Sequence, residues 1–141
     1  MSPRKSFLKA KDGASAVEFA LIAPMFFMVL LTMLAFGIYL SAANSVQQIA
    51  ADAARTAIAG LTETERNTLV KNFVDQNAAG YPFIDKAKLT VVTHDNTADG
   101  NQFVVSASYD ARNLPIWYLL SNLPLPSMTI ARQSTIRVGG I

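Results

Sequence analysis

The sequence predicts an α+β protein: a long N-terminal transmembrane helix continues into a small soluble domain with a second helix and an antiparallel sheet of about three strands. Three observations predict this. No charged side chain occurs from Phe19 to Ala51, although charged residues make up 16% of the chain. The apolar period changes from helical to alternating in the second half. Finally, 141 residues suffice for one small domain beside an anchor.

The first thirteen residues form a basic leader. They carry a net charge of +3, whereas residues 14–141 sum to −1. Positive charge flanking a membrane span stays inside, so we expect a cytoplasmic N-terminus and a periplasmic C-terminal domain, in a single pass through a bacterial inner membrane. Nucleic acid is not an expected partner, because binding it takes clustered basic charge on a folded face.

The span itself covers Phe19 to Ala43. A helix needs ~20 apolar residues to cross a bilayer, and the apolar core of a secretory signal peptide has only about 7–15. The length therefore indicates an anchor in the lipid bilayer. Pro24 interrupts the run and predicts a helix kink; whether that kink is harmless or serves packing stays open.

Glu18 stands at the edge of the apolar run. A carboxylate carried into hydrocarbon costs at least ~3 kcal/mol unless it is paired, whereas one in the headgroup layer is unremarkable. Its surroundings favour the first interpretation: Gly13 ends the basic leader, Ala14 follows, and Glu18 comes four residues later, on the same helix face as Ala14.

This arrangement resembles a class III signal peptide, which a prepilin peptidase cleaves. The resemblance implies a cut between Gly13 and Ala14, the processing site, after which Glu18 is the fifth mature residue. The new ammonium of Ala14 would then pair with Glu18 of a neighbouring subunit. Such an assembly charge fixes the stagger between subunits, a documented use of buried ion pairs.

The blocks GASAVEFALIAP and SAANSVQQIAADAARTAIAG flank the span and resemble the TadE-like family of pilin-like proteins, over roughly residues 13–60. The resemblance implies a minor pilin-like subunit (pseudopilin) for biogenesis of a tight-adherence, or Flp-type (type IVc), pilus. Its partners would be the peptidase, other pilin-like subunits and the secretion platform. TadE and TadF subtypes both fit the length.

We therefore expect a cleaved leader at 1–13, a transmembrane and extended helix at 14–60, and an extracytoplasmic α+β domain at 61–141. The helix is predicted to continue over Ser41–Ala59 and to stop at Gly60. Val46, Ile49 and Ala53 share a helical stripe on this extension, which is either core or a partner site.

A second helix is predicted by the capping box of Thr62 with Glu65. Gly80 and Pro82 should end it. Its apolar face consists of Leu69, Val70, Phe73 and Val74.

Three strands follow in the predicted order. The first covers Lys88–His94, the second Gln102–Tyr109 and the third about Met128–Val138, with a hairpin loop at Asn96–Asn101. On the second strand, alternate residues should face the core: Phe103, Val105, Ala107 and Tyr109. On the third, the candidates are Ile130, Ile136 and Val138.

The segment Leu114–Pro126 is apolar, aromatic and punctuated by proline. Two interpretations stay open. It is either a long connection packed over the core, or an exposed patch with Trp117 and Tyr118 that docks another subunit or the membrane.

Nothing in the sequence indicates an enzyme. There is no cysteine, and His94 is the only histidine, so nucleophile–base pairs and metal sites lack partners. Asp95, Asp99 and Gly100 resemble a calcium loop only weakly, because Ser106 stands where the loop needs glutamate. We expect no cofactor and no small-molecule substrate.

Three functions remain after this reasoning. The chain is a processed fibre subunit, a processed component that stays in the assembly platform, or an unprocessed inner-membrane-anchored periplasmic binding or scaffold domain. The arrangement of Gly13 and Glu18 separates the third from the first two, which share the same processing.

Overall fold

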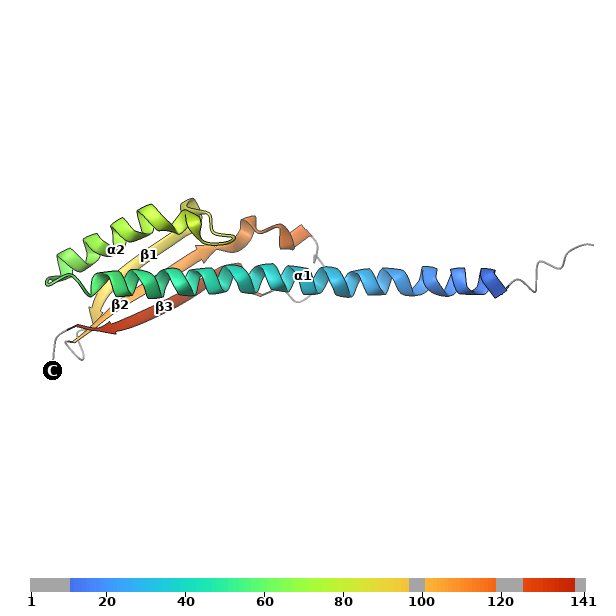
Figure 1. Ribbon diagram of the computed structural model, residues 1–141, viewed down its shortest axis with the longest axis horizontal. Helices are drawn as coiled ribbons and strands as arrows, with labels where there is room; N and C mark the ends of the chain where they lie inside the picture. The colour runs from blue at the N-terminus through green and yellow to red at the C-terminus, as the bar shows by residue number, and fades with distance from the viewer. Residues whose placement is uncertain (1–10, 97–100, 119–125, 139–141) are drawn as a thin grey trace, which may run out of the picture. The chain divides into compact units, whose positions relative to one another are not determined.

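The computed structural model describes residues 11–96, 101–118 and 126–138. It confirms the predicted class: a long apolar helix, a second helix and a three-stranded antiparallel sheet (Figure 1). The described residues belong to two units, one ending at Leu34 and one starting at Ala35. Most of the predicted leader, the tip of the predicted hairpin loop and residues 119–125 lie outside the described residues.

Helix α1 covers Lys11–Ala57 and includes Pro24. It ends two residues before the predicted Ala59, because the Gly60 amide turns back to donate to the Ala57 carbonyl at 3.0 Å. A side chain at position 60 would place its Cβ 2.8 Å from the backbone nitrogen of Arg66. Only glycine fits at this junction.

Helix α2 covers Glu63–Asn77, and its predicted capping box is confirmed. The Thr62 hydroxyl accepts from the Glu65 amide at 3.2 Å, while the Glu65 carboxylate accepts from the Thr62 amide at 3.2 Å. The α-helix ends at Asn77, and a 3-10 turn, η2 (Ala78–Gly80), completes it.

The sheet has the order β1–β2–β3, with β1 at Leu89–Asn96, β2 at Gln102–Asp110 and β3 at Thr129–Arg137. All pairs are antiparallel. Each strand starts and ends within two residues of its predicted bounds. Short 3-10 turns precede β1 and follow β2: η3 (Lys86–Lys88), η4 (Ala111–Asn113) and η5 (Pro115–Tyr118).

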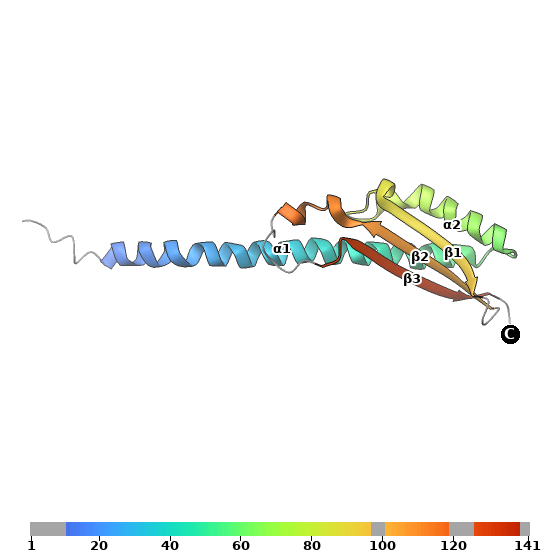
Figure 2. The same cartoon turned by 180° about the vertical axis from the view of Figure 1, so that it is seen from behind.

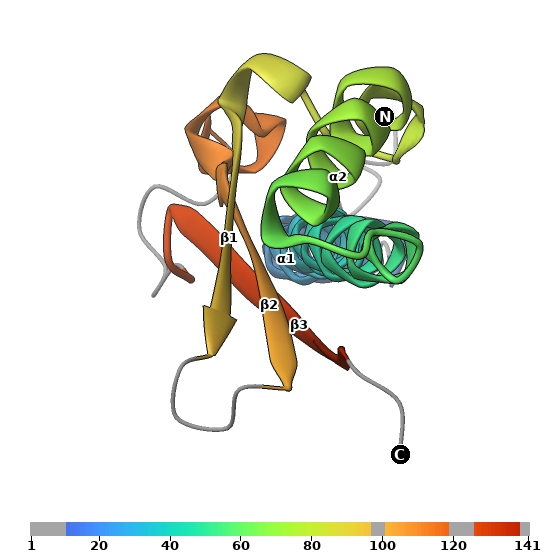
Figure 3. The same ribbon diagram turned by 90° about the vertical axis from the view of Figure 1, so that its left-hand side faces the viewer.

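Both helices of the second unit cover one face of this sheet (Figure 3). Four alternate residues of β2, predicted to face the core, are buried there: Phe103, Val105, Ala107 and Tyr109. The stripe on α1 packs against this sheet, since Val46, Ile49 and Ala53 are fully buried. Within this unit, the stripe is therefore core. Ile130 is buried and Ile136 and Val138 are half-buried.

The opposite face of the sheet is not covered by the two helices (Figure 2). Its middle rows are formed by small or polar residues such as Thr90, Ser106, Ser108 and Gln133. An antiparallel sheet commonly buries one face and leaves the other in water, and this polar face fits that arrangement.

A tight turn at Tyr81–Ile84 is tied to α1. The Ile84 amide donates to the Tyr81 carbonyl at 3.3 Å, and Phe83 adopts a left-handed conformation with φ of 60°. Proline followed by a left-handed residue is the arrangement of a type II turn, which normally prefers glycine at the latter position. The Ser45 hydroxyl donates to the Pro82 carbonyl at 2.8 Å and anchors the turn.

Candidate functional site: the apolar part of α1 and Glu18

The part of α1 up to Leu34 is apolar on every side. Its large side chains are exposed around the whole helix, from Val17 to Leu34. A helix that is hydrophobic all round belongs in a membrane or inside a larger assembly. It is also long and apolar enough to cross a bilayer by length and composition. The helix therefore fits a membrane-anchored protein.

Glu18 is the only charged residue between Ala14 and Ala51. Thr32, a polar residue within the apolar run, has a partner in its own helix: its hydroxyl donates to the Met28 carbonyl of the preceding turn at 2.8 Å. The Glu18 side chain is exposed, in contrast, on a surface of apolar side chains. A carboxylate in such surroundings favours a cationic partner from another molecule.

Gly13 is the third residue of α1, and Ala14 follows it in the first turn. A Cβ added at Gly13 would meet nothing within 4 Å. Helix termini fray, and glycine is about 1 kcal/mol less favourable than alanine in a helix. The bond between Gly13 and Ala14 therefore lies where α1 is easiest to unwind. Cleavage there stays a prediction.

Pro24 lies within α1, ten residues after Ala14. Proline lacks the amide hydrogen that would bond to the carbonyl four residues earlier, here that of Ala20. The helix nevertheless continues on both sides. The predicted kink and its role stay predictions.

Trp117 and Tyr118 form the end of η5 and differ in exposure. The indole Nε1 of Trp117 donates to the Ala111 carbonyl at 2.6 Å, and its ring is half-buried. Leu114 and Ile116 beside it are buried, whereas Tyr118 is 92% exposed. The described part of the segment thus packs its aliphatic residues on the core and leaves one tyrosine outside. A partner role for the two aromatic residues stays a prediction.

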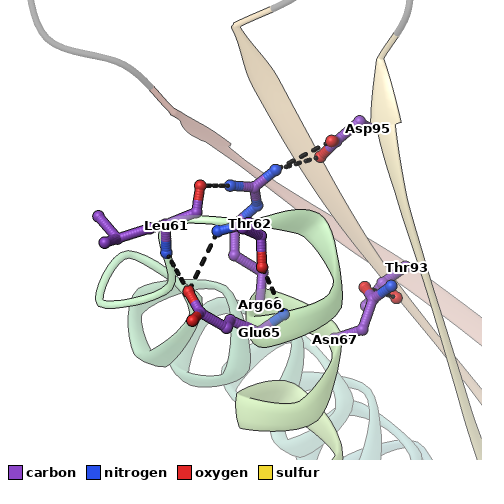
Figure 4. Close-up of polar contacts among 7 residues, drawn as sticks. All are labelled: Leu61, Thr62, Glu65, Arg66, Asn67, Thr93 and Asp95. Carbon is purple, nitrogen blue, oxygen red and sulfur yellow. Dashed lines mark hydrogen bonds and ion pairs between the residues drawn. The ribbon is translucent and has the colours of Figure 1, made fainter.

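Sequence reasoning missed the contacts that fasten α2 to β1 (Figure 4). Arg66 is buried, and its NH2 donates to both carboxylate oxygens of Asp95 at 2.9 and 3.1 Å. Its guanidinium also lies 5.3 Å from the centre of the Phe103 ring. At the next residue of α2, the Asn67 side-chain oxygen accepts from the Thr93 hydroxyl at 2.7 Å. The sequence contains one indication that Arg66 is buried: it lies four residues before Val70 and therefore on the apolar face of α2.

A second missed contact joins the Tyr81 turn to α1. The Tyr81 hydroxyl donates to the Asp52 carboxylate at 2.8 Å. Burial raises the pKa of Tyr81 to about 12, and the hydrogen bond and negative charge of Asp52 act in the same direction. Asp52 also pairs with Arg55 at 2.7 Å, one turn further along the helix.

These contacts join elements of the second unit to one another. Within residues 11–96, 101–118 and 126–138, no group of three or more His, Asp or Glu residues could hold a metal ion. Asp95, which the weak calcium-loop pattern includes, is instead the partner of Arg66. His94 lies on β1, as expected for a strand residue.

Residues 13–55 match the protein family described as TadE-like protein. This is 43 of the 141 residues, and it contains Gly13, Glu18 and Pro24. The family suggests a pilin-like protein associated with the tight-adherence pilus, and it is not known to be enzymatic. Searches of curated proteins and of solved structures found no match.

Proposed function

We propose that this chain, whose residues 13–55 match the TadE-like family, is a minor pilin-like subunit for biogenesis of a tight-adherence, Flp-type pilus. The observation that carries the proposal is Glu18: it is the only charged residue between Ala14 and Ala51, and the part of α1 around it is apolar on every side up to Leu34. A simple membrane anchor needs no such charge, whereas a subunit that packs against others in register does.

In the proposed maturation, a prepilin peptidase cleaves between Gly13 and Ala14 and removes the basic leader. The amide bond is hydrolysed, which leaves a carboxylate on Gly13 and an amine on Ala14 that is protonated at neutral pH. Easy unwinding of the first turn of α1 supports this site, because a protease binds its substrate in an extended conformation.

The new ammonium and Glu18 then compensate each other inside an apolar bundle. Within one chain they share a helix face at positions i and i+4, and between chains the ammonium of one subunit meets Glu18 of its neighbour. Both charges are costly in hydrocarbon when alone, so packing at any other stagger is penalised. The pair thereby specifies the register of assembly.

The proposed location follows from the charge asymmetry of the chain. The basic leader stays in the cytoplasm, α1 crosses the inner membrane once, and the sheet domain faces the periplasm. Other pilin-like subunits and the secretion platform are the proposed partners, and incorporation into an extracellular fibre would follow extraction from the membrane.

Processing is tested by the intact mass of the protein purified from its native membrane. We expect a mature start at Ala14, and an uncut chain when Gly13→Leu blocks the protease. Gly37→Leu is the matched control, because a Cβ at either glycine meets nothing within 4 Å. That variant should be cut normally. A wild-type protein that keeps its leader would instead support an unprocessed, membrane-tethered periplasmic domain.

The assembly charge is tested separately with Glu18→Gln, which keeps the shape of the side chain and removes its charge. We expect normal insertion and cleavage, and at least a tenfold loss of co-purification with the other pilin-like subunits, since ~1.4 kcal/mol corresponds to tenfold. Glu63→Gln, on the exposed first turn of α2, is the control. Wild-type piliation with Glu18→Gln would refute the charge-pair argument.

A further inference from the structure

In the second unit, the segment that carries Trp117 and Tyr118 packs beside the last residues of the uncharged run of α1. Ala35 and Ala42 belong to the uncharged run, yet both are fully buried in the cluster that contains Leu114 and Ile116. The Tyr39 hydroxyl donates to the Ser127 carbonyl at 3.2 Å. Folded residues of the domain therefore surround one side of a helix segment that is still composed as a membrane span.

The other side of the same helix turns stays uncovered and apolar. Within the second unit, Phe36 is 39% exposed and Leu40 is 58% exposed. Neither residue lies on a face that suits water, and α1 carries no charged residue between Glu18 and Asp52. Between Ala35 and Ala42 the helix thus packs on the domain with one side and exposes apolar side chains on the other. This is what we expect of a helix segment at the edge of a bilayer.

The residues exposed beside this edge are of the interfacial kind. Tyr118 is 92% exposed and Met128 is 51% exposed, while Trp117 is half-buried with its indole nitrogen satisfied by Ala111. Tryptophan and tyrosine concentrate at the headgroup level of membranes, because an apolar ring and a polar atom suit the two sides of that layer. The nearby Arg112 pairs with Asp110 at 3.3 Å, so the surface has no excess charge from this pair.

We propose that this surface, formed by Phe36, Leu40, Trp117, Tyr118 and Met128, lies in the headgroup layer of the bilayer that holds α1. Its partner is the phospholipid surface rather than another protein. The apolar surface of α1 continues into it without a charged residue between, and the interaction should depend little on lipid charge. The sheet domain would then rest on the membrane instead of being tethered above it.

A consequence concerns the length left to cross the hydrocarbon. If the interface lies near Ala35, the ~20 residues that a span requires reach back to about Ser15. Glu18 then lies within the hydrocarbon edge rather than in the headgroups. The inference itself does not rest on the proposed cleavage, since it concerns only the far end of the span.

The test uses the full chain, one copy per lipid nanodisc, and quenching of tryptophan fluorescence by phosphatidylcholine brominated near the top of its acyl chains. Trp117 is the only tryptophan, so the wild type gives the first reading. The second comes from the double variant Trp117→Phe, Tyr118→Trp. The control is Trp117→Phe, Leu61→Trp, because Leu61 is 90% exposed at the α1–α2 junction.

We expect the brominated lipid to lower the fluorescence at position 118 at least twofold, with no change at position 61. Aqueous iodide should show the reverse order. Circular dichroism of both double variants must match the wild type, and the native Trp117 keeps the test valid should Trp117→Phe perturb the fold. Equal quenching at 118 and 61, or strong iodide quenching at 118, would overturn the inference. Single-copy discs exclude a second copy as the cause of protection.

Discussion

Both parts of α1 are helical and rich in apolar residues, but they differ in the size of the side chains that they expose or bury. Up to Leu34 the helix exposes large residues such as Phe19, Met25 and Phe26 on all sides. From Ala35 on, its buried positions are mostly alanine: Ala35, Ala42, Ala43, Ala50, Ala53, Ala54 and Ala57. Size therefore separates the two parts better than hydropathy does. The large side chains of the first part are exposed, whereas the small ones of the second part let a sheet approach the helix backbone.

The largest difference in stability is expected when one large side chain is removed from each of the two parts. Phe103→Ala empties a fully buried position under α1 and should destabilise the second unit by about 3–5 kcal/mol. Phe26→Ala changes an exposed residue of the first unit and should leave that value unchanged. Urea titration in detergent, followed by the fluorescence of Trp117, measures both. Equal losses would mean that the two parts are not independent.

The reverse substitution, from small to large, should have the next largest effect. Ala53→Leu inserts bulk where α1 packs under the sheet and is expected to cost about 2 kcal/mol. Ala20→Leu places the same bulk on the exposed part of the helix, and there we expect no loss. The urea midpoints of the two variants give the answer. A neutral Ala53→Leu would show that the sheet has room to move away from α1.

Two hydroxyl groups, one in each part of α1, differ in what they stabilise. Ser45 donates to Pro82, 37 residues away, whereas Thr32 donates to Met28 within its own helix. Ser45→Ala should cost about 1–1.5 kcal/mol, because the Pro82 carbonyl loses its donor. Thr32→Val should cost nothing measurable in the same unfolding experiment. A silent Ser45→Ala would mean that water replaces the serine at the turn.

The smallest expected effect depends on pH. Folding raises the pKa of Tyr81 to about 12 from an ordinary value of 10.0. The folded state therefore holds this proton more tightly, so its contribution is full below pH 10 and disappears as the pH rises towards 12. Tyr81→Phe should cost about 1 kcal/mol at pH 8, and this advantage of the wild type should shrink above pH 10 and be gone before pH 12. The exposed Tyr118→Phe serves as control.

Much of the fold could be predicted because its signals are local. The capping box of Thr62 and Glu65 fixes where α2 begins, and the alternation along Gln102–Tyr109 fixes which residues of β2 face the helices. The end of α1 lies two residues before the predicted one, since the Gly60 amide donates to the Ala57 carbonyl three residues earlier and closes a tight turn there. Glycine is required at this turn because Arg66, six residues later, fills the space that a side chain at position 60 would need.

The contacts that fasten the elements to one another could not be predicted in the same way. Arg66 and Asp95 are 29 residues apart, as are Asp52 and Tyr81, and nothing in the local pattern of either residue indicates its partner. A charged residue on a helix is usually solvated, so the buried Arg66 goes against the general tendency. For Glu18 the reason differs: its proposed partner is on another molecule, and a single chain contains only half of the pair.

The alanine-rich surface of α1 also matters during biosynthesis. Helix α1 is synthesised before any strand, and strand β3 is synthesised last. Positions such as Ala50 and Ala53 therefore stay exposed for most of translation, until the sheet covers them. A large apolar surface that stays exposed during synthesis promotes aggregation. Methyl groups offer little area to a wrong partner, so the small residues that permit close packing in the finished protein also protect the unfinished one.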